Sequence, residues 1–231
     1  MPETMKQTLS LHPLLIENDV QGLVFDLDGT IIDSAADIIE GLRITFEEAG
    51  LGRLPADYFP DNLHGTSAGM MRDIIASMGW PMPDDLAPLK TNYIGHYRAL
   101  DHRNTQLYPG VAAVLEACHE AGIPMAICTN KIHANALMAL EKVGLSGLFD
   151  YVSGSDTWSQ AKPSPLPLLE TIRMLGLEPA QCLYFGDTSV DAICARDAGV
   201  PFVLHTSGFG DAALKGHSQL LAFQQWEELM G

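Results

Sequence analysis

The sequence predicts an α/β protein in which a doubly wound, Rossmann-like parallel sheet carries an inserted α-helical domain. Two observations lead to this fold class. Short apolar runs alternate with segments of helical period, and one connection between two of these runs is far too long for a simple crossover. Alternating strands and helices are typical of a parallel sheet that is covered by helices on both faces.

Five short apolar runs are expected to be the buried strands of this sheet. They span residues 22–25, 124–128, 151–153, 182–185 and 201–204. Four amphipathic segments are expected to be crossover helices, and each is followed by a glycine that would end it. They span residues 111–121, 132–143, 166–175 and 190–198.

The connection over residues 31–123 is much longer than a whole strand-helix-strand unit of roughly 30 residues. It also carries its own helix signals. The capping pair Ser34-x-x-Asp37 predicts the start of one helix, a second helix is expected after Thr66, and a third over residues 85–100. We therefore expect a core domain formed by residues 1–33 and 103–231, and a helical domain over residues 34–102.

The composition excludes several classes of partner. The chain has 231 residues with 13 Lys and Arg against 29 Asp and Glu, a net charge of -16 that would repel nucleic acid. No apolar stretch reaches the roughly 18 residues of a membrane span, and residues 1–18 lack a signal-peptide pattern. The four cysteines have no CxxC spacing and are expected to be small core residues. These features predict a cytoplasmic protein that binds neither nucleic acid nor membrane.

Polar side chains follow the expected strands, at the edge of an open parallel sheet where ligands bind. The first strand is followed by two acids, the second by a hydroxyl and an amide at a helix start, the third by a lysine, and the fourth by two more acids. Gly29 allows a sharp turn beside the first two acids. The residues concerned are Asp26, Asp28, Thr129, Asn130, Lys162, Asp187 and Asp191.

Four carboxylates gathered in one place require a cation. Because the ligands are oxygen atoms, with no His or Cys among them, Mg2+ is favoured over zinc. A carboxylate able to act as nucleophile, a second carboxyl group for proton transfer, a metal ion, a lysine and a hydroxyl together indicate phosphoryl transfer through an aspartyl-phosphate.

These residues occur in four ordered motifs, and with them the chain resembles the haloacid dehalogenase-like hydrolases. Within that family it is most similar to phosphatases with a helical cap between the first and second motifs. The resemblance covers most of the chain and implies a strand order of 3-2-1-4-5 and a mobile cap that closes over the site. The motifs are Val-Phe-Asp-Leu-Asp-Gly-Thr at 24–30, Ile-Cys-Thr-Asn at 127–130, Lys-Pro-Ser-Pro at 162–165 and Gly-Asp-Thr-Ser-Val-Asp at 186–191.

The resemblance implies a role for each core residue. Asp26 would be the nucleophile, and Asp28 would protonate the leaving oxygen and then activate water. Thr129 and Lys162 would hold the phosphoryl oxygens, with Asn130 beside them as a substrate-binding residue.

The resemblance also implies the metal site. Asp26, the backbone carbonyl of Asp28, and Asp187 would bind Mg2+, and Asp191 would act through water or by supporting these ligands. The second acid, Asp28, disfavours dehalogenase activity, because the dehalogenating members of the family lack it.

Phosphoglycolate is the favoured substrate, because the chain is similar to the phosphoglycolate phosphatase-like subgroup at Asp33-Ser34, at Tyr-Pro-Gly-Val over 108–111 and at Gly208. The segment 205–210 departs from that subgroup, which leaves a sugar phosphate or pyrophosphate open. Two further alternatives are a phosphomutase similar to β-phosphoglucomutase and a non-enzymatic receiver that accepts a phosphoryl group.

Residues of the helical domain would choose among these substrates. A lone His or Arg on a helix is most often a solvated surface residue, so these candidates are weaker than the core motifs. Ser34 and Thr188 are expected to cap helices, and Thr30 to support the turn. The candidates in the helical domain are His64, Thr66, Arg72, Tyr93, His96 and Arg98.

Overall fold

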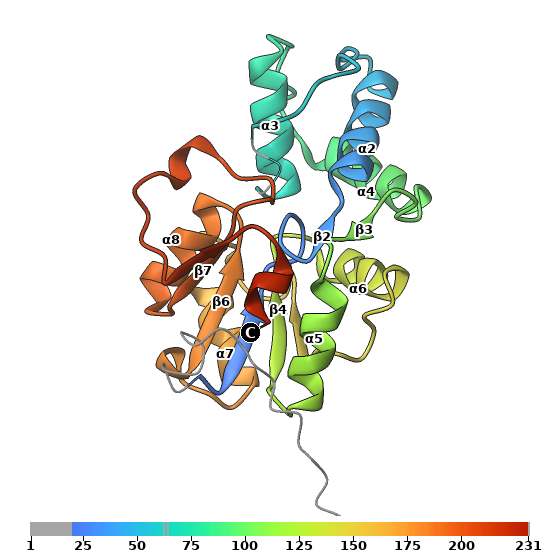
Figure 1. The fold of residues 1–231 in the computed structure, drawn as a ribbon. Helices are drawn as coiled ribbons and strands as arrows, with labels where there is room; N and C mark the ends of the chain where they lie inside the picture. Colours follow the sequence, from blue (N-terminus) through green and yellow to red (C-terminus); the bar gives the residue numbers. More distant parts are fainter. Residues whose placement is uncertain (1–19, 62, 64, 231) are drawn as a thin grey trace, which may run out of the picture.

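The computed structural model describes residues 20–61, 63 and 65–230 (Figure 1). The segment 1–18, used above to judge targeting, and the candidate His64 lie outside the described residues. Among the helices that are described, none is long and apolar enough to cross a membrane.

In the described chain, six strands form one parallel sheet in the order β5-β4-β1-β6-β7-β8. The five expected strands occur within one residue of their predicted bounds and in the expected order 3-2-1-4-5, so the fold class is confirmed. The strands are β1 (Gly22–Phe25), β4 (Met125–Cys128), β5 (Tyr151–Ser153), β6 (Cys182–Gly186), β7 (Phe202–His205) and β8 (Leu221–Phe223). The edge strand β8 was not predicted, because its three residues are too few to show a period.

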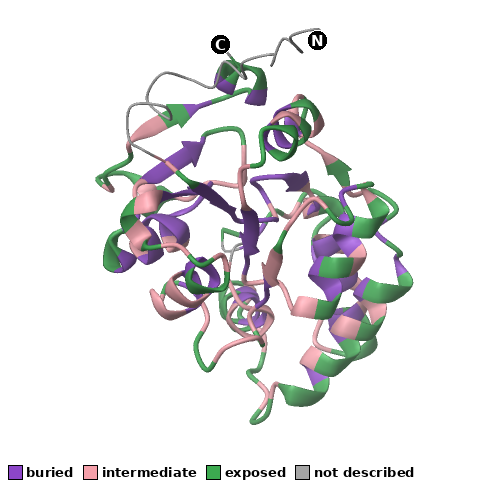
Figure 2. Ribbon diagram, turned by 90° about the horizontal axis from the view of Figure 1, so that it is seen from below, coloured by how far each residue is buried: buried purple, intermediate pink, exposed green. Residues whose placement is uncertain are grey.

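The central strand β1 supplies side chains to both faces of the sheet. Leu23 and Phe25 pack into one apolar cluster, whereas Val24 packs into another on the opposite face. Figure 2 shows the buried strands lying between helices whose outer turns are exposed. The first face is covered by α5 (Val111–Glu120) and α6 (His133–Lys142), the second by α7 (Leu166–Met174) and α8 (Ser189–Ala198).

A helical domain lies over the carboxyl ends of the strands (Figure 1). Its helices pack around their own apolar cluster, which includes Leu42, Phe46, Met71 and Ile74. Short strands at its two linkers, β2 (Ile32–Asp33) and β3 (Gln106–Leu107), pair antiparallel and were not predicted. The boundaries at 34 and 102 stay a prediction. The helices are α2 (Ala35–Glu48), α3 (Ser67–Ser77) and α4 (Ala87–Ala99).

The prediction that Ser34 and Asp37 form a capping pair is wrong. Ser34 stands at the N-cap position of α2, but its hydroxyl donates to the carboxylate of Asp28 rather than capping the helix. Asp37 accepts hydrogen bonds from the backbone and side chain of Asn104 and from the hydroxyl of Thr105, all within 3.4 Å. Tertiary partners therefore outcompete the local contact that the spacing suggested.

All four cysteines, Cys118, Cys128, Cys182 and Cys194, lie in the described part of the chain, where they are buried and free. Burial raises the pKa of each thiol, for example that of Cys182 to about 11. Neutral buried thiols behave as small apolar side chains, which confirms that these cysteines serve the core.

Phe25 is expected to contribute strongly to stability. Its ring is 1% exposed and stacks on Phe185 with 4.8 Å between centroids. Phe25→Ala should lower the free energy of unfolding by about 3–5 kcal/mol, because it removes buried area and leaves a cavity. The control Phe59→Ala removes a ring that is 54% exposed and should change stability by about 0.5 kcal/mol or less. Urea unfolding followed by circular dichroism measures both, and equal losses would contradict the assignment of the core.

Candidate active site

Asp26 lies directly beyond β1, at the carboxyl edge of the sheet. Its backbone N–H donates to the carbonyl of Phe185 on β6 at 2.8 Å, which fixes the chain at this point. The side chain is buried, and its Oδ1 lies 2.9 Å from Nζ of Lys162. Burial raises the pKa of Asp26 to about 6, although the charge of Lys162 opposes this shift.

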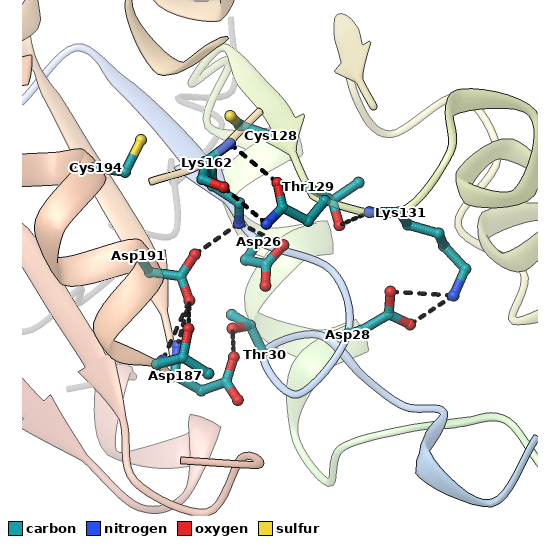
Figure 3. Close-up of polar contacts among 12 residues, drawn as sticks. Asp26, Asp28, Thr30, Cys128, Thr129, Lys131, Lys162, Asp187, Asp191 and Cys194 are labelled. Carbon is teal, nitrogen blue, oxygen red and sulfur yellow. Dashed lines mark hydrogen bonds and ion pairs between the residues drawn. The ribbon is translucent and has the colours of Figure 1, made fainter. Parts of the chain in front are cut away.

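Lys162 is the buried cation of the site (Figure 3). In addition to its ion pair with Asp26, the ammonium donates to Asp191 Oδ1 at 2.6 Å and to the hydroxyl oxygen of Tyr184 at 2.7 Å. Burial alone would lower the pKa of Lys162, but the charges of Asp191 and Asp26 hold it above its usual value. The amide of Asn130 bonds the backbone N–H and carbonyl of Lys162 at 3.0 and 3.1 Å, which positions the lysine.

Asp191 uses both carboxylate oxygens on groups of the protein. Oδ1 accepts from Lys162 and Tyr184, and Oδ2 accepts from the backbone N–H and the hydroxyl of Thr188 at 3.2 and 2.7 Å. Burial would raise the pKa of Asp191, but the contact with Lys162 lowers it overall. Thr188 and Asp191 form a capping box at the start of α8, as expected of Thr188. Of the two roles expected for Asp191, these contacts favour the supporting one.

Asp187 follows β6 and lies beside Asp26. Its Oδ1 accepts from the hydroxyl of Thr30 at 2.9 Å, and its Oδ2 accepts from the backbone N–H of Phe209 at 2.7 Å. Thr30 therefore holds the carboxylate of Asp187 in place beside the turn at Gly29. Burial raises the pKa of Asp187 well above its usual value, and the charges of Asp191 and Asp26 add to this shift.

Asp26, Asp187 and Asp191 could together hold a metal ion. Each offers a carboxylate oxygen, and these atoms lie within 4.8 Å of one another. When all three carboxylates are ionised, the ammonium of Lys162 balances one of them and two negative charges are left in a buried site, which is unfavourable unless a cation compensates them. In the described chain this group contains only oxygen donors, which suits a hard divalent cation.

Asp28 contacts a different cation. Nζ of Lys131 lies 2.8 and 3.0 Å from its two carboxylate oxygens, and the hydroxyl of Ser34 donates to it as well. Figure 3 shows this pair apart from the group around Lys162. The spacing of two residues predicts one shared site for Asp26 and Asp28. In the structure both residues line the same cavity, but the carboxylate of Asp28 pairs with Lys131 and not with the group around Lys162.

A cavity of about 50 Å³ lies between Asp26 and the helical domain. Thr129 is one of the residues that line it. The backbone N–H of Thr129 donates to the carbonyl of Ser153 at 2.9 Å, and its hydroxyl oxygen accepts from the backbone N–H of Lys131 at 3.1 Å. The helical domain contributes a mainly apolar wall. Lining side chains include Asp28, Asn130, Lys131 and Asn135 of the core and Ile38, Leu63, Met70, Tyr93 and Tyr97 of the helical domain.

The structure separates the candidates of the helical domain. Of these, Tyr93 lines the cavity. Thr66 caps α3, where its hydroxyl oxygen accepts from the N–H of Gly69 at 3.3 Å. Arg72 is exposed and borders a separate surface depression.

The remaining two candidates make structural contacts. His96 lies 2.9 Å from the hydroxyl of Thr45 and 3.0 Å from the carboxylate of Glu48. Arg98 donates to the side-chain oxygen of Asn135 at 2.9 Å, which ties the helical domain to the core.

The family model for haloacid dehalogenase-like hydrolases matches residues 23–205. The chain belongs to this family. It is 34% identical to a phosphoglycolate phosphatase of Agrobacterium fabrum over 192 residues, 83% of this chain and 82% of the relative. It is 35% identical to one of Aquifex aeolicus over 191 residues, 81% of this chain and 85% of the relative.

The fold agrees with solved structures as well. The crystal structure of a predicted phosphoglycolate phosphatase from Haemophilus somnus matches 91% of this chain and 96% of that chain, with a TM-score of 0.83 and 22% sequence identity. At that identity the likeness shows the fold. The family match and the two relatives above identify the chain as a phosphatase of the haloacid dehalogenase-like hydrolases.

Sequence reasoning missed three residues that shape the site of this haloacid dehalogenase-like hydrolase. Lys131 pairs with Asp28, and its position right after a strand-end motif could have revealed it. Tyr184 bonds Lys162 from inside an apolar strand, where the sequence offers no signal. His205 Nδ1 lies 2.9 Å from the carbonyl oxygen of Gly29 and steadies the turn. Burial lowers the pKa of His205, which favours the neutral ring at pH 7.

Gly29 is required by the close packing around Asp187. Its φ is +86°, and a Cβ there would lie 2.2 Å from Oδ2 of that acid. Gly208 lies in the loop after β7, and a Cβ on it would lie 2.3 Å from the carbonyl oxygen of Gly29. Two glycines far apart in the sequence thus leave room for the Asp187 carboxylate.

Gly29→Ala should destabilise the protein more than Gly176→Ala does. Gly176 also has a positive φ, of +72°, but a Cβ there would meet nothing within 4 Å. The control isolates the cost of the left-handed backbone, about 1–2 kcal/mol. The collision with Asp187 should lower the free energy of unfolding of the Gly29 variant by a further ~1–3 kcal/mol. Chemical denaturation measures both, and equal losses would show that the packing around Asp187 is looser than described.

Proposed function

We propose that this phosphatase is Mg2+-dependent and hydrolyses a small phosphate monoester through an aspartyl-phosphate, with phosphoglycolate as the preferred substrate. The observation that carries the proposal is the environment of Asp26. Its buried carboxylate lies at the open edge of the sheet, 2.9 Å from the ammonium of Lys162 and within 4.8 Å of Asp187. A carboxylate with a cation and a second acid beside it suits attack on a phosphoryl group.

In the first step a carboxylate oxygen of Asp26 attacks phosphorus, and the bond between phosphorus and the ester oxygen breaks. Lys162 and Thr129 stabilise the charge on the phosphoryl oxygens. Asp28 gives its proton to the leaving oxygen, which departs as an alcohol. For this transfer the carboxyl group of Asp28 has to leave Lys131, with which it pairs in the structure.

In the second step Asp28 takes a proton from water, and the resulting hydroxide attacks phosphorus. The bond to Asp26 breaks, inorganic phosphate leaves, and both acids return to their starting protonation states. The helical domain lies over the cavity and limits the access of water during the first step. Thr129 and Lys162 hold the phosphoryl group in place throughout.

Asp26, Asp187 and the backbone carbonyl of Asp28 would hold the metal ion. When bound, Mg2+ neutralises charge on the phosphoryl oxygens and compensates the two excess negative charges of the site. Asp191 stays with Lys162 and fixes its position. Asn130 acts in the same way through the backbone of Lys162, so we propose a positioning role for it as well.

Phosphoglycolate is supported by the relatives, which carry the name phosphoglycolate phosphatase. Among the candidates of the helical domain, Tyr93 is the one we place beside the substrate. Thr66 and Arg72 are left out, because one caps a helix and the other is exposed elsewhere.

Asp26→Asn should lower phosphate release by about 10³-fold or more, because the amide cannot form the aspartyl-phosphate. Asp84→Asn, at an exposed acid, is the matched control and should retain wild-type turnover. Phosphate release is measured over a panel of phosphoglycolate, sugar phosphates and pyrophosphate. Full Mg2+-dependent turnover by pure Asp26→Asn protein would refute the nucleophile. Isomerisation of a sugar 1-phosphate without phosphate release would support the phosphomutase alternative instead.

Removal of divalent ions with EDTA should stop turnover, and added Mg2+ should restore it. In addition, Mg2+ at 100 times its Kd should stabilise the wild type by about 2.7 kcal/mol, a rise in Tm of about 5–10 °C for a chain of this size. Asp187→Asn should lose most of this rise, whereas the control Asp84→Asn should keep it. Differential scanning fluorimetry measures the shift without relying on activity, and an unchanged shift in Asp187→Asn would contradict the metal site.

A further inference from the structure

Lys131 is a buried lysine that the mechanism above does not use. It lies in the loop between β4 and α6, two residues after Thr129. Its side chain is 6% exposed, and its ammonium lies 4.6 Å from the centre of the Tyr97 ring. Lys131 lines the cavity that Asp26 also lines, and so do the two residues that its ammonium contacts, Asp28 and Tyr97. A lysine enclosed in this way costs desolvation energy, which its contacts with Asp28 and Tyr97 offset.

Among the described residues that line the cavity, Lys131 is the cation. The ammonium of Lys162 instead contacts Asp26, Asp191 and Tyr184. The cationic side chains of the helical domain discussed above, Arg98 and Arg72, are not among the residues that line the cavity: Arg98 donates to Asn135, and Arg72 borders a separate depression. In a protein with a net charge of -16, an anionic group of the substrate beyond its phosphate needs a local cation.

We infer that Lys131 is the specificity-determining residue that binds a carboxylate on the non-phosphate part of the substrate. The inference rests on the proposed phosphatase function and names the substrate class, phosphate monoesters that carry a carboxylate. Such a carboxylate takes the place of Asp28 beside the ammonium of Lys131. The ion pair between Lys131 and Asp28 is thereby replaced by one between Lys131 and the substrate. A phosphate monoester without a carboxylate offers no such replacement.

The exchange also links recognition to chemistry. While Lys131 holds both oxygens of Asp28, that carboxyl group is turned away from Asp26, where a leaving oxygen would lie. A substrate carboxylate at Lys131 frees Asp28 to turn toward the reacting bond. Binding energy from a remote part of the substrate then raises turnover as well as affinity. Ser34 stays within reach of Asp28 and limits how far it moves.

The first test uses the wild-type protein with three substrates of similar size: phosphoglycolate, its carboxylate methyl ester, and 2-hydroxyethyl phosphate. The value of kcat/KM for phosphoglycolate should exceed that for the two analogues without a carboxylate by about 30-fold or more, the range for a buried charge pair that loses one partner. Equal values for all three would overturn the role of Lys131 and leave the phosphatase function standing. Failure to release phosphate from any of them, or from a generic aryl phosphate, would overturn the phosphatase function itself.

The second test compares variants by the ratio of kcat/KM for phosphoglycolate to that for 2-hydroxyethyl phosphate. Lys131→Met should lower this ratio by about 30-fold or more, and Lys131→Arg should restore part of it by keeping the charge. The matched control is Lys142→Met, which removes an exposed lysine paired with Asp101 and should keep the wild-type ratio. The Mg2+-dependent rise in Tm shows whether each variant is folded. A wild-type ratio in folded Lys131→Met protein would overturn the inference, and the first test decides the matter if that variant does not fold.

Discussion

The excess of negative charge around Lys162 is the constraint on which the rest of the site depends. Asp26, Asp187 and Asp191 are buried within 4.8 Å of one another, and one ammonium lies among them. Neighbouring contacts serve to hold that ammonium in place, since Tyr184 and the side chain of Asn130 both bind Lys162. The remaining charge makes the site a receptor for a cation, and for a phosphoryl group that shares it.

The two buried lysines lie on different sides of the acids of the first motif. Lys162 belongs to the core and pairs with Asp26, whereas Lys131 faces the cavity and pairs with Asp28. The helical domain supplies mainly apolar side chains, together with Tyr93 and Tyr97, to the same cavity. The core therefore provides the charges, and the helical domain excludes water from them, which strengthens each electrostatic interaction.

Regular elements of the fold could be predicted because their signals are local. The strand of β1 and the helix α8 follow from short apolar runs and from amphipathic segments ended by glycine, and their bounds agree within one residue. The ribbon of β2 and β3 and the edge strand β8 contain two or three residues each, too few to show a period. The capping pair predicted for Ser34 and Asp37 does not form, because the carboxylate of Asp37 accepts from Asn104, which is distant in the sequence.

By itself, the sequence determined which chemical groups reach the edge of the sheet, because residues that follow parallel strands must gather there. Asp26, Asp187 and Lys162 could be assigned to one site on that ground alone. Only the tertiary structure decided which partner each group takes. Asp28 and Lys131 are separated by 103 positions, and their contact forms because two strand-end loops meet beneath the helical domain. The energy of such a pair depends on burial and distance, and neither is encoded by residue type or spacing.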